Sequence, residues 1–455
     1  MTKPNILLLT IDTLRADTLG YAGYKKPITP NIDKLASQGI RFTQAITPGS
    51  WTQAAFPGII TSTYACMYGG CLGRLSPERP SPVKIMGDEG GYETAAFSTS
   101  PLLSRTYGYD RKFQRFNDLN PGEKSPKIRG IKGGQALLRR PIVHQIAKLF
   151  GQNWRPPKLY ATAAELNDAA MPWLASIGEP FMAWLHYMDV HWPYHLEDEL
   201  TKPKDIADAW ADLSHLHEVN WHGAPVTPEQ KARYIRLYEE AIAYTDAQIG
   251  RLMDFLDETG LADNTVIVLV SDHGEEFLER RHWGHVELNL YDEILKVPML
   301  MRIPGVPGNQ VIGQQVSTMD IMPTLLELAG CHIPEKVLGK SLVPLWDGDP
   351  ADYGVEVAIG ERWRDTSHMI AVRTEEYKYI WDDAKPDEPL LFDLRRDPEE
   401  RNNIAAENPE VVEALHQHVD AQLERMRRTA PAEMSKEPVL DEEIVERLRG
   451  LGYVE

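Results

Sequence analysis

Three clusters of polar side chains each follow a short apolar run of the chain. The clusters are Asp12-Thr13, Asp272-His273, and His186 with Asp189 and His191. If the apolar runs are parallel strands, their carboxyl ends meet at one edge of a sheet, where α/β enzymes place their active site. Two carboxylates and an imidazole suit a divalent cation such as Ca²⁺, Mn²⁺ or Zn²⁺. A lone Asp at such a place is more often a loop or cap residue, so the metal-site prediction depends on the three clusters together.

Short apolar runs that alternate with helical segments predict the elements that position these clusters. The expected strands are Asn5 to Thr10, Ile40 to Ala45, Glu93 to Ser98, Phe181 to Tyr187 and Thr265 to Val270. The expected helices are residues 30–39, a segment that opens at Phe56 to Thr61, and Pro228 to Glu258. This alternation predicts an α/β fold, with a large, doubly wound, mostly parallel sheet between helices.

The pattern changes near residue 355. Met369 to Arg373 and Tyr377 to Trp381 resemble a hairpin, Leu390 to Leu394 adds a third short strand, and a helix follows over Pro409 to Met426. We therefore expect a catalytic domain over residues 1–355 and a small α+β subdomain over residues 356–455.

The overall charge limits the partners. The chain has 455 residues and a formal net charge of -19. Nucleic acid is excluded as the main partner, because phosphate backbones demand clustered Lys and Arg. A small anionic ester is compatible with such a chain if a bound cation supplies the local positive charge.

Residues 119–160 differ from the rest of the chain, because nine Lys or Arg stand there against one acid, Glu123. Within them, residues 136–150 form an amphipathic, basic segment that Pro141 is expected to break. An inserted lid over the domain is the favoured interpretation. A surface for an anionic lipid or an anionic substrate is the alternative.

The three cysteines are Cys66, Cys71 and Cys331. This odd, low count indicates a reducing compartment and no disulfide framework. Four residues separate Cys66 from Cys71, but without a second pair or a nearby His in the sequence we favour free thiols over a metal site. The N-terminus lacks the pattern of a signal peptide, and no apolar run is long enough to span a membrane. We expect a soluble, cytoplasmic protein, and a homo-oligomer is left open.

Seven segments, in order along nearly the whole chain, resemble the sulfatase family of the alkaline phosphatase superfamily. They are ILLLTIDTLRADTLGYAGY, LHYMDVHWPY, VLVSDHGEEF, HWGHVELNLYDEILKVPMLMRIPG, MDIMPTLLELAG, LFDLRRDPEERNNIA and LRGLGYVE. The resemblance implies that Asp12, Asp272 and His273 bind the metal. The family often has a second Asp where this chain has Thr13, which leaves the identity of the metal open.

The resemblance also points to a nucleophile. Alignment of Ile59-Ile60-Thr61 with the family's Leu-Leu-Thr-Gly puts Thr52 where sulfatases carry the Cys or Ser that becomes formylglycine. Ala54 and Phe56 replace the Pro and Arg of that motif, so no formylglycine is expected. A metal can activate the Thr52 hydroxyl. Ser50 is the alternative nucleophile, and Thr52 as a mere helix N-cap is the structural alternative.

The remaining site residues are carried over in the same way. His285 and His191 match family positions that contact the transferred group, and we assign them to substrate contact or to proton donation to the leaving oxygen. Further candidates for substrate binding are Thr13, Arg15, His186, Asp189, His282 and Lys296. A second metal near Asp189 and His191 is left open.

The predicted activity is metal-dependent cleavage of a sulfate ester through Thr52. The alternatives are a phosphodiesterase, a phosphonate monoester hydrolase or a phosphoethanolamine-type transferase that uses the same site. A threonine ester cannot collapse as a formylglycine hydrate does, and this favours phosphate chemistry. A non-catalytic member that binds an anion is the third hypothesis.

Overall fold

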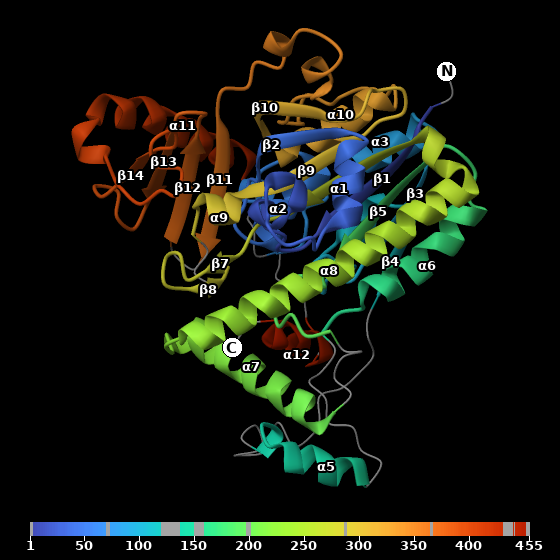
Figure 1. Ribbon diagram of the computed structural model, residues 1–455. Helices are drawn as coiled ribbons and strands as arrows, with labels where there is room; N and C mark the ends of the chain where they lie inside the picture. The colour runs from blue at the N-terminus through green and yellow to red at the C-terminus, as the bar shows by residue number, and fades with distance from the viewer. Residues whose placement is uncertain are drawn as a thin grey trace.

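The structure is a computed structural model. It describes residues 3–69, 73–119, 137–149, 159–196, 202–285, 289–364, 367–430, 440 and 442–451. An eight-stranded sheet lies between helices, and a four-stranded antiparallel sheet follows in the C-terminal part (Figure 1). This arrangement confirms the predicted fold class.

The large sheet has the strand order β10-β2-β9-β6-β1-β5-β3-β4. Its strands are β1 (Asn5–Ile11), β2 (Ile40–Ile46), β3 (Glu93–Ser98), β4 (Arg115–Asp118), β5 (Phe181–Tyr187), β6 (Thr265–Ser271), β9 (Lys296–Arg302) and β10 (Gln310–Ser317). β9 is antiparallel to β2 and β6, and the other neighbouring strands are parallel. β1 pairs with β5 on one side and with β6 on the other, so the three strands that precede the polar clusters are adjacent.

Helices cover both faces of this sheet. One face carries α1 (Pro30–Ser37), α6 (Ala163–Ser176) and α8 (Pro228–Thr259). The other carries α2 (Thr52–Thr61), α3 (Pro82–Asp88) and α10 (Ile321–Leu328). Alternate residues of β1 enter these two cores, Leu7 and Leu9 on the first face and Ile6 and Leu8 on the second. Burial on both faces explains why β1, β5 and β6 are rich in apolar residues with no alternation.

The helix expected to open at Phe56 begins four residues earlier, at Thr52. Trp51 is the N-cap residue, and its side chain makes no capping hydrogen bond. Thr52 is therefore the first residue of α2 and not its cap. This position removes the structural alternative in which Thr52 serves only as the N-cap.

The small sheet contains β11 (Ala358–Arg364), β12 (Ser367–Arg373), β13 (Tyr377–Asp382) and β14 (Leu390–Asp393), in that order. Its core includes residues of α11 (Pro409–Thr429), such as Leu415 and Val419. β12, β13 and β14 were expected from the sequence, whereas β11 was not. The division into two domains at residue 355 stays a prediction.

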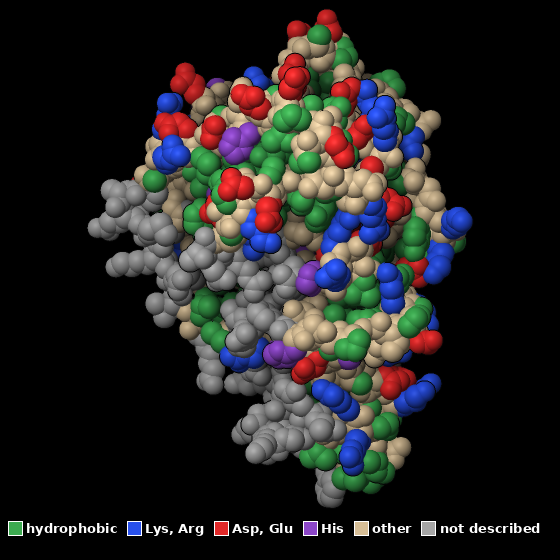
Figure 2. Space-filling model, turned by 90° about the vertical axis from the view of Figure 1, so that its left-hand side faces the viewer, with side chains coloured by type: hydrophobic (Ala, Val, Ile, Leu, Met, Phe, Trp, Pro, Cys, Tyr) green, Lys and Arg blue, Asp and Glu red, His purple; other side chains and the backbone are tan. Residues whose placement is uncertain are grey.

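The basic segment is described in part. Helix α5 (Pro141–Leu149) begins at Pro141 and contacts α7 (Pro203–His222). His144 and Ala147 are buried, whereas Ile142, Ile146 and Leu149 are exposed. Hydrophobic and basic side chains gather at the lower end of the molecule, where α5 lies (Figure 2). The rest of the predicted lid, residues 120–136 and 150–158, is outside the described residues. Among the helices that are described, none is both long and apolar enough to cross a membrane.

Candidate active site

The predicted clusters converge at one edge of the large sheet. Ile11, the last residue of β1, is in register with Tyr187 of β5 and Ser271 of β6. The residues that follow these three strand ends therefore start from the same level. The structure brings Asp12, Asp272 and His273 together there, as the sequence predicted.

Asp12, Asp272 and His273 form a compact group of ligand atoms. His273 Nε2 lies 3.7 Å from Asp12 Oδ1 and 3.6 Å from Asp272 Oδ2. The ligand atoms of the three residues all lie within 4.8 Å of one another, and all three side chains are buried. Such spacing leaves room for one ion between them.

The hydrogen bonding of this group fits a cation. Asp12 Oδ1, Asp272 Oδ2 and His273 Nε2 are buried, and no other described group donates to them or accepts from them. Burial and the charge of Asp12 raise the pKa of Asp272 to about 8, while burial lowers the pKa of His273 to about 4. Two buried carboxylates this close repel each other unless a positive charge lies between them. A divalent cation would also satisfy the three unpaired atoms.

Thr13 has a strained backbone beside this group. Its φ of 57° lies in the left-handed region, which a β-branched residue rarely adopts. The turn lets the Thr13 backbone N–H donate to Asp272 Oδ1, at 3.3 Å. The Thr13 hydroxyl is buried without a described partner. Strain of this kind is typical of functional sites.

Thr52, the first residue of α2, lies beside the same group. Its Oγ1 donates to Asp12 Oδ2 across 3.5 Å, and the side chain is buried. Ser50 is buried as well, and the described residues offer its hydroxyl no hydrogen-bond partner. Thr52 is therefore in contact with Asp12, one of the predicted metal ligands, and no such contact is described for Ser50.

His186 lies beside Asp12. Its Nε2 lies 3.5 Å from Asp12 Oδ2, and its Nδ1 lies 2.9 Å from the hydroxyl of Thr10. Burial lowers the pKa of His186 to about 3, so the imidazole is neutral near pH 7. Thr10 in turn accepts a hydrogen bond from the Trp184 indole, at 2.9 Å. This chain of contacts orients His186 toward Asp12.

Two more predicted histidines lie beside the group, in tilted and edge-to-face ring contacts. The His285 ring centroid lies 4.5 Å from that of His273 and 5.1 Å from that of His191. Both His285 and His191 are buried, which lowers their pKa, to about 3 for His285. The structure thus gathers five predicted residues around Asp12, namely Thr52, His186, His191, His273 and His285.

Glu275 is a site residue that the sequence analysis missed. Its Oε1 lies 3.0 Å from His285 Nδ1, and its Oε2 accepts a hydrogen bond from the Tyr194 hydroxyl, at 3.2 Å. Tyr194 also accepts from the Trp283 indole. Glu275 therefore fixes the ring of His285. A signal was available, since Glu275 follows His273 by two residues at the end of a strand.

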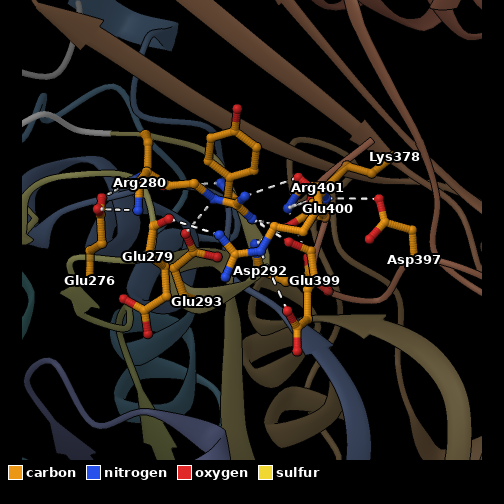
Figure 3. A network of polar contacts seen from close by, with 12 residues as sticks. Glu276, Glu279, Arg280, Asp292, Glu293, Lys378, Asp397, Glu399, Glu400 and Arg401 are labelled. Atoms are coloured by element: carbon orange, nitrogen blue, oxygen red, sulfur yellow. Dashed lines mark hydrogen bonds and ion pairs between the residues drawn. The ribbon is translucent and has the colours of Figure 1, made fainter. Parts of the chain in front are cut away.

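Arg15 and Lys296 line a different cavity, of about 780 Å³, whose described lining includes neither the metal group nor Thr52. Arg15 contacts the backbone oxygen of Glu275 at 2.7 Å and the carboxylates of Asp17 and Glu279 at 2.7 and 2.9 Å. It thereby joins the loop after β1 to the loop after β6. Figure 3 shows the ionic network at this cavity, which extends into the C-terminal part.

Two predicted residues remain without a described role at the group. His282 is half-buried in the hairpin of β7 (Glu276–Phe277) and β8 (Trp283–Gly284), where its backbone N–H donates to Glu276 at 2.9 Å. Asp189 is buried in the loop after β5 that also carries His191. The substrate-binding assignments of Asp189, His282, Arg15 and Lys296 stay predictions.

Comparison with known proteins gives the class of the enzyme, a hydrolase of sulfuric or phosphoric esters. The chain belongs to the sulfatase family, which matches residues 4–331. A second match, described as N-sulphoglucosamine sulphohydrolase, C-terminal, covers residues 283–429. The predicted family resemblance is confirmed.

Curated relatives span most of the chain. Arylsulfatase K of Rattus norvegicus is 30% identical over 465 residues, which cover 91% of this chain and 77% of the relative. Arylsulfatase K of Canis lupus familiaris is 26% identical, covering 91% and 81%. The multifunctional alkaline phosphatase superfamily protein PehA of Trinickia caryophylli is also 26% identical, covering 90% and 92%.

Solved structures share the fold. A protein in complex with its substrate D-glucosamine-2-N,6-O-disulfate superimposes with a TM-score of 0.72 at 18% identity, covering 94% of this chain and 98% of the other. The phosphonate monoester hydrolase of Agrobacterium radiobacter gives a TM-score of 0.70 at 21% identity, covering 94% and 96%. Relatives with this fold therefore act on both sulfur and phosphorus esters.

Proposed function

We propose that this protein is a metal-dependent hydrolase that cleaves a sulfate ester with Thr52 as its nucleophile. The observation that carries the proposal is the hydrogen bond from Thr52 Oγ1 to Asp12, within a buried group of cation-ligand spacing. The strained Thr13 and the histidine rings in contact around this group support the same assignment.

Asp12, Asp272 and His273 would hold the metal, with Ca²⁺, Mn²⁺ and Zn²⁺ as the candidates. A bound divalent ion supplies charge that favours the alkoxide of a nucleophilic hydroxyl and the anionic oxygens of the ester. Placement of Thr52 at the first position of α2 acts in the same direction, because the amino-terminal end of a helix favours negative charge.

The remaining steps fall to side chains. Thr52 Oγ1 gives its proton to Asp12 Oδ2, the acceptor of its hydrogen bond, and attacks the sulfur or phosphorus in line, while the bond from that atom to the leaving oxygen breaks. His285 or His191 gives the leaving oxygen its proton. Water then attacks the threonine ester, releases the anion and restores the hydroxyl.

The histidines need a proton for this role. Burial lowers the pKa of His285 and of His191, which favours neutral rings in the resting protein. An anionic ester within a few ångströms favours the protonated imidazole and raises the pKa. Proton donation is thereby coupled to substrate binding.

A phosphodiesterase or phosphonate monoester hydrolase is the second candidate. A threonine ester must be released by water, which favours phosphorus esters over sulfate esters. The shared fold of a phosphonate monoester hydrolase, and the similarity to PehA, support this candidate. A phosphoethanolamine-type transferase differs only in the acceptor that replaces water.

A non-catalytic anion-binding role finds less support. A simple anion site needs positive charge, whereas this group brings two buried carboxylates next to a hydroxyl. Those carboxylates hinder anion binding unless a metal is present. A second metal near Asp189 and His191 remains a proposal.

Paired turnover assays test the substrate class. The metal-reconstituted enzyme is supplied with an aryl sulfate, a phosphate diester and a phosphonate monoester, and Thr52→Ala is the blank. Our proposal expects sulfate release well above the blank. Dominant phosphodiester or phosphonate cleavage would move the assignment to the second candidate, and no turnover of any ester would support the binding role.

A further inference from the structure

A second group of potential metal ligands lies outside the active site. It contains Cys66, in the segment after α2, Glu361 of β11 and His368 of β12. Their ligand atoms all lie within 4.8 Å of one another, and Cys66 Sγ is 3.9 Å from His368 Nε2. The three residues are only 8%, 0% and 2% exposed. The group shares no residue with Asp12, Asp272 and His273.

The carboxylate of Glu361 is buried, and no Lys or Arg within the described residues forms an ion pair with it. It accepts hydrogen bonds from the Cys66 backbone N–H, at 3.4 Å, and from the Gln422 side-chain amide. Burial of an unpaired carboxylate is costly, and coordination of a cation is one of the few arrangements that offsets the cost.

The donor atoms specify the kind of cation. A thiolate sulfur and an imidazole nitrogen are poor ligands for Ca²⁺ or Mg²⁺, whereas Zn²⁺ combines them with a carboxylate oxygen. We propose that Cys66, Glu361 and His368 form a second metal site that binds Zn²⁺ through sulfur, nitrogen and oxygen. Three protein ligands leave one tetrahedral position for a water molecule.

The position of this second metal site next to α2 indicates a structural role for the ion. The Glu361 backbone N–H donates to Pro48 O at 2.9 Å, and Glu361 forms a β-bridge with Gly49. This contact lies only a few residues before Thr52. A metal at Cys66, Glu361 and His368 would fasten the small sheet to both sides of α2, the helix that begins with the proposed nucleophile (Figure 1). The ion would have a positioning role and would not touch the substrate.

Cobalt substitution tests the site without an activity measurement. Co²⁺ bound to a thiolate gives a sulfur-to-metal charge-transfer absorption in the near ultraviolet, and the Asp12 group contains no sulfur. The metal-free protein titrated with Co²⁺ should therefore show this absorption. Asp272→Asn, which removes a ligand of the active-site group, should leave it in place.

Cys66→Ser should abolish the absorption and lower the bound zinc by one ion per chain, while Cys331→Ser serves as the matched control and changes neither. If Cys66→Ser fails to fold, His368→Gln provides the test instead. It keeps the thiol and should weaken zinc binding at least tenfold. An absorption that is missing in the unaltered protein, or unchanged in Cys66→Ser, would overturn the proposal. Loss of turnover in Thr52→Ala bears only on the active site, so the two proposals fail independently.

Discussion

Asp12 and Asp272 are both buried and lie close together at the cost of mutual repulsion, and this is the physical reason for the cation that we propose between them. Burial and the neighbouring Asp12 raise the pKa of Asp272 to about 8. A carboxyl whose pKa is raised in the folded state keeps its proton there while the unfolded chain loses it. The free energy of unfolding of the metal-free protein should therefore fall as pH rises from about 4 to about 8.

The Asp272→Asn variant tests this relation. In the presence of a chelator it should lose less stability than the unaltered protein between pH 5 and 8, as measured by urea unfolding at each pH. Added metal should stabilise the unaltered protein by about 2.7 kcal/mol at a hundredfold excess over Kd, and Asp272→Asn by less. Identical pH profiles for the two proteins would show that Asp272 is not under this repulsion.

Glu275 should matter through His285. Glu275→Gln replaces the carboxyl group that faces His285 Nδ1 with an amide of the same size, so kcat should fall by about 10- to 100-fold, as is common when the partner of a functional histidine is removed. The metal content should stay unchanged, and the pH profile of kcat should shift. Glu276→Gln is the matched control, since Glu276 contacts the hairpin backbone and not His285. Equal losses in both variants would point to a structural effect.

Residue types at strand ends were enough to predict Asp12, Asp272 and His273, because parallel strands bring their carboxyl ends together. They were not enough for Glu275, whose role comes from a contact with His285 ten residues away in a turn. Lys296 shows that a place at this edge of the sheet does not by itself put a side chain in the active site. It begins β9 at the same edge of the sheet, yet its side chain lines the cavity beside Arg15 and Asp17.

At the scale of elements, a buried ionic network joins the large sheet to the small one. Asp292, in α9 (Asp292–Leu295), pairs with Arg373 of β12 at 2.9 Å and with Lys378 of β13 at 2.8 Å. Burial opposes ionisation of Asp292, but the charges of Lys378 and Arg373 outweigh it and hold its pKa well below the usual value. This carboxylate therefore stabilises the fold above its unfolded pKa of about 4, and the contribution is lost as pH falls.

Asp292→Asn should destabilise the protein by about 3–5 kcal/mol at pH 7, because it leaves the buried Arg373 without its carboxylate partner and leaves Lys378 with Glu400 alone. The loss should shrink as pH falls below about 4. Asp168→Asn is the control, since its exposed pair with Arg251 should contribute less than about 1 kcal/mol. Chemical denaturation measures all three proteins, and a loss of less than about 1 kcal/mol in Asp292→Asn would contradict the structural role.

Most of the helices and strands could be predicted from the sequence. Runs that are apolar on both faces identified β1, β5 and β6, because only strands covered on two sides have that composition. The start of α2 at Thr52 was missed, since no side chain caps the helix and Trp51 carries no capping signal. The antiparallel direction of β9 depends on its contacts with β2 and β6, which are distant in the sequence and which local patterns do not encode.

At the scale of the whole molecule, charge opposes the approach of the proposed substrate. The chain carries a formal charge of -19, and an anionic ester meets that field before it reaches the proposed metal site. Salt screens repulsion between like charges, so kcat/KM should rise about twofold between 10 and 150 mM salt. A fall in kcat/KM over the same range would show that local positive charge attracts the ester. The basic segment at 119–160 would supply that charge.

The exposed apolar face of α5 leaves the role of that segment open between a lid and a lipid-facing surface. The cytoplasmic location likewise stays a prediction, because it depends on cysteine usage and on the N-terminal residues alone.

The central claim is that Thr52 is the nucleophile of a metal-dependent ester hydrolase. The most direct measurement compares kcat for the unaltered enzyme, Thr52→Ala, Thr52→Ser and Ser50→Ala, with the bound metal quantified in each. We predict that Thr52→Ala loses about 10³-fold or more in kcat at unchanged metal content, while Thr52→Ser and Ser50→Ala keep measurable turnover. Full turnover by metal-loaded Thr52→Ala, or its loss in Ser50→Ala alone, would contradict the assignment.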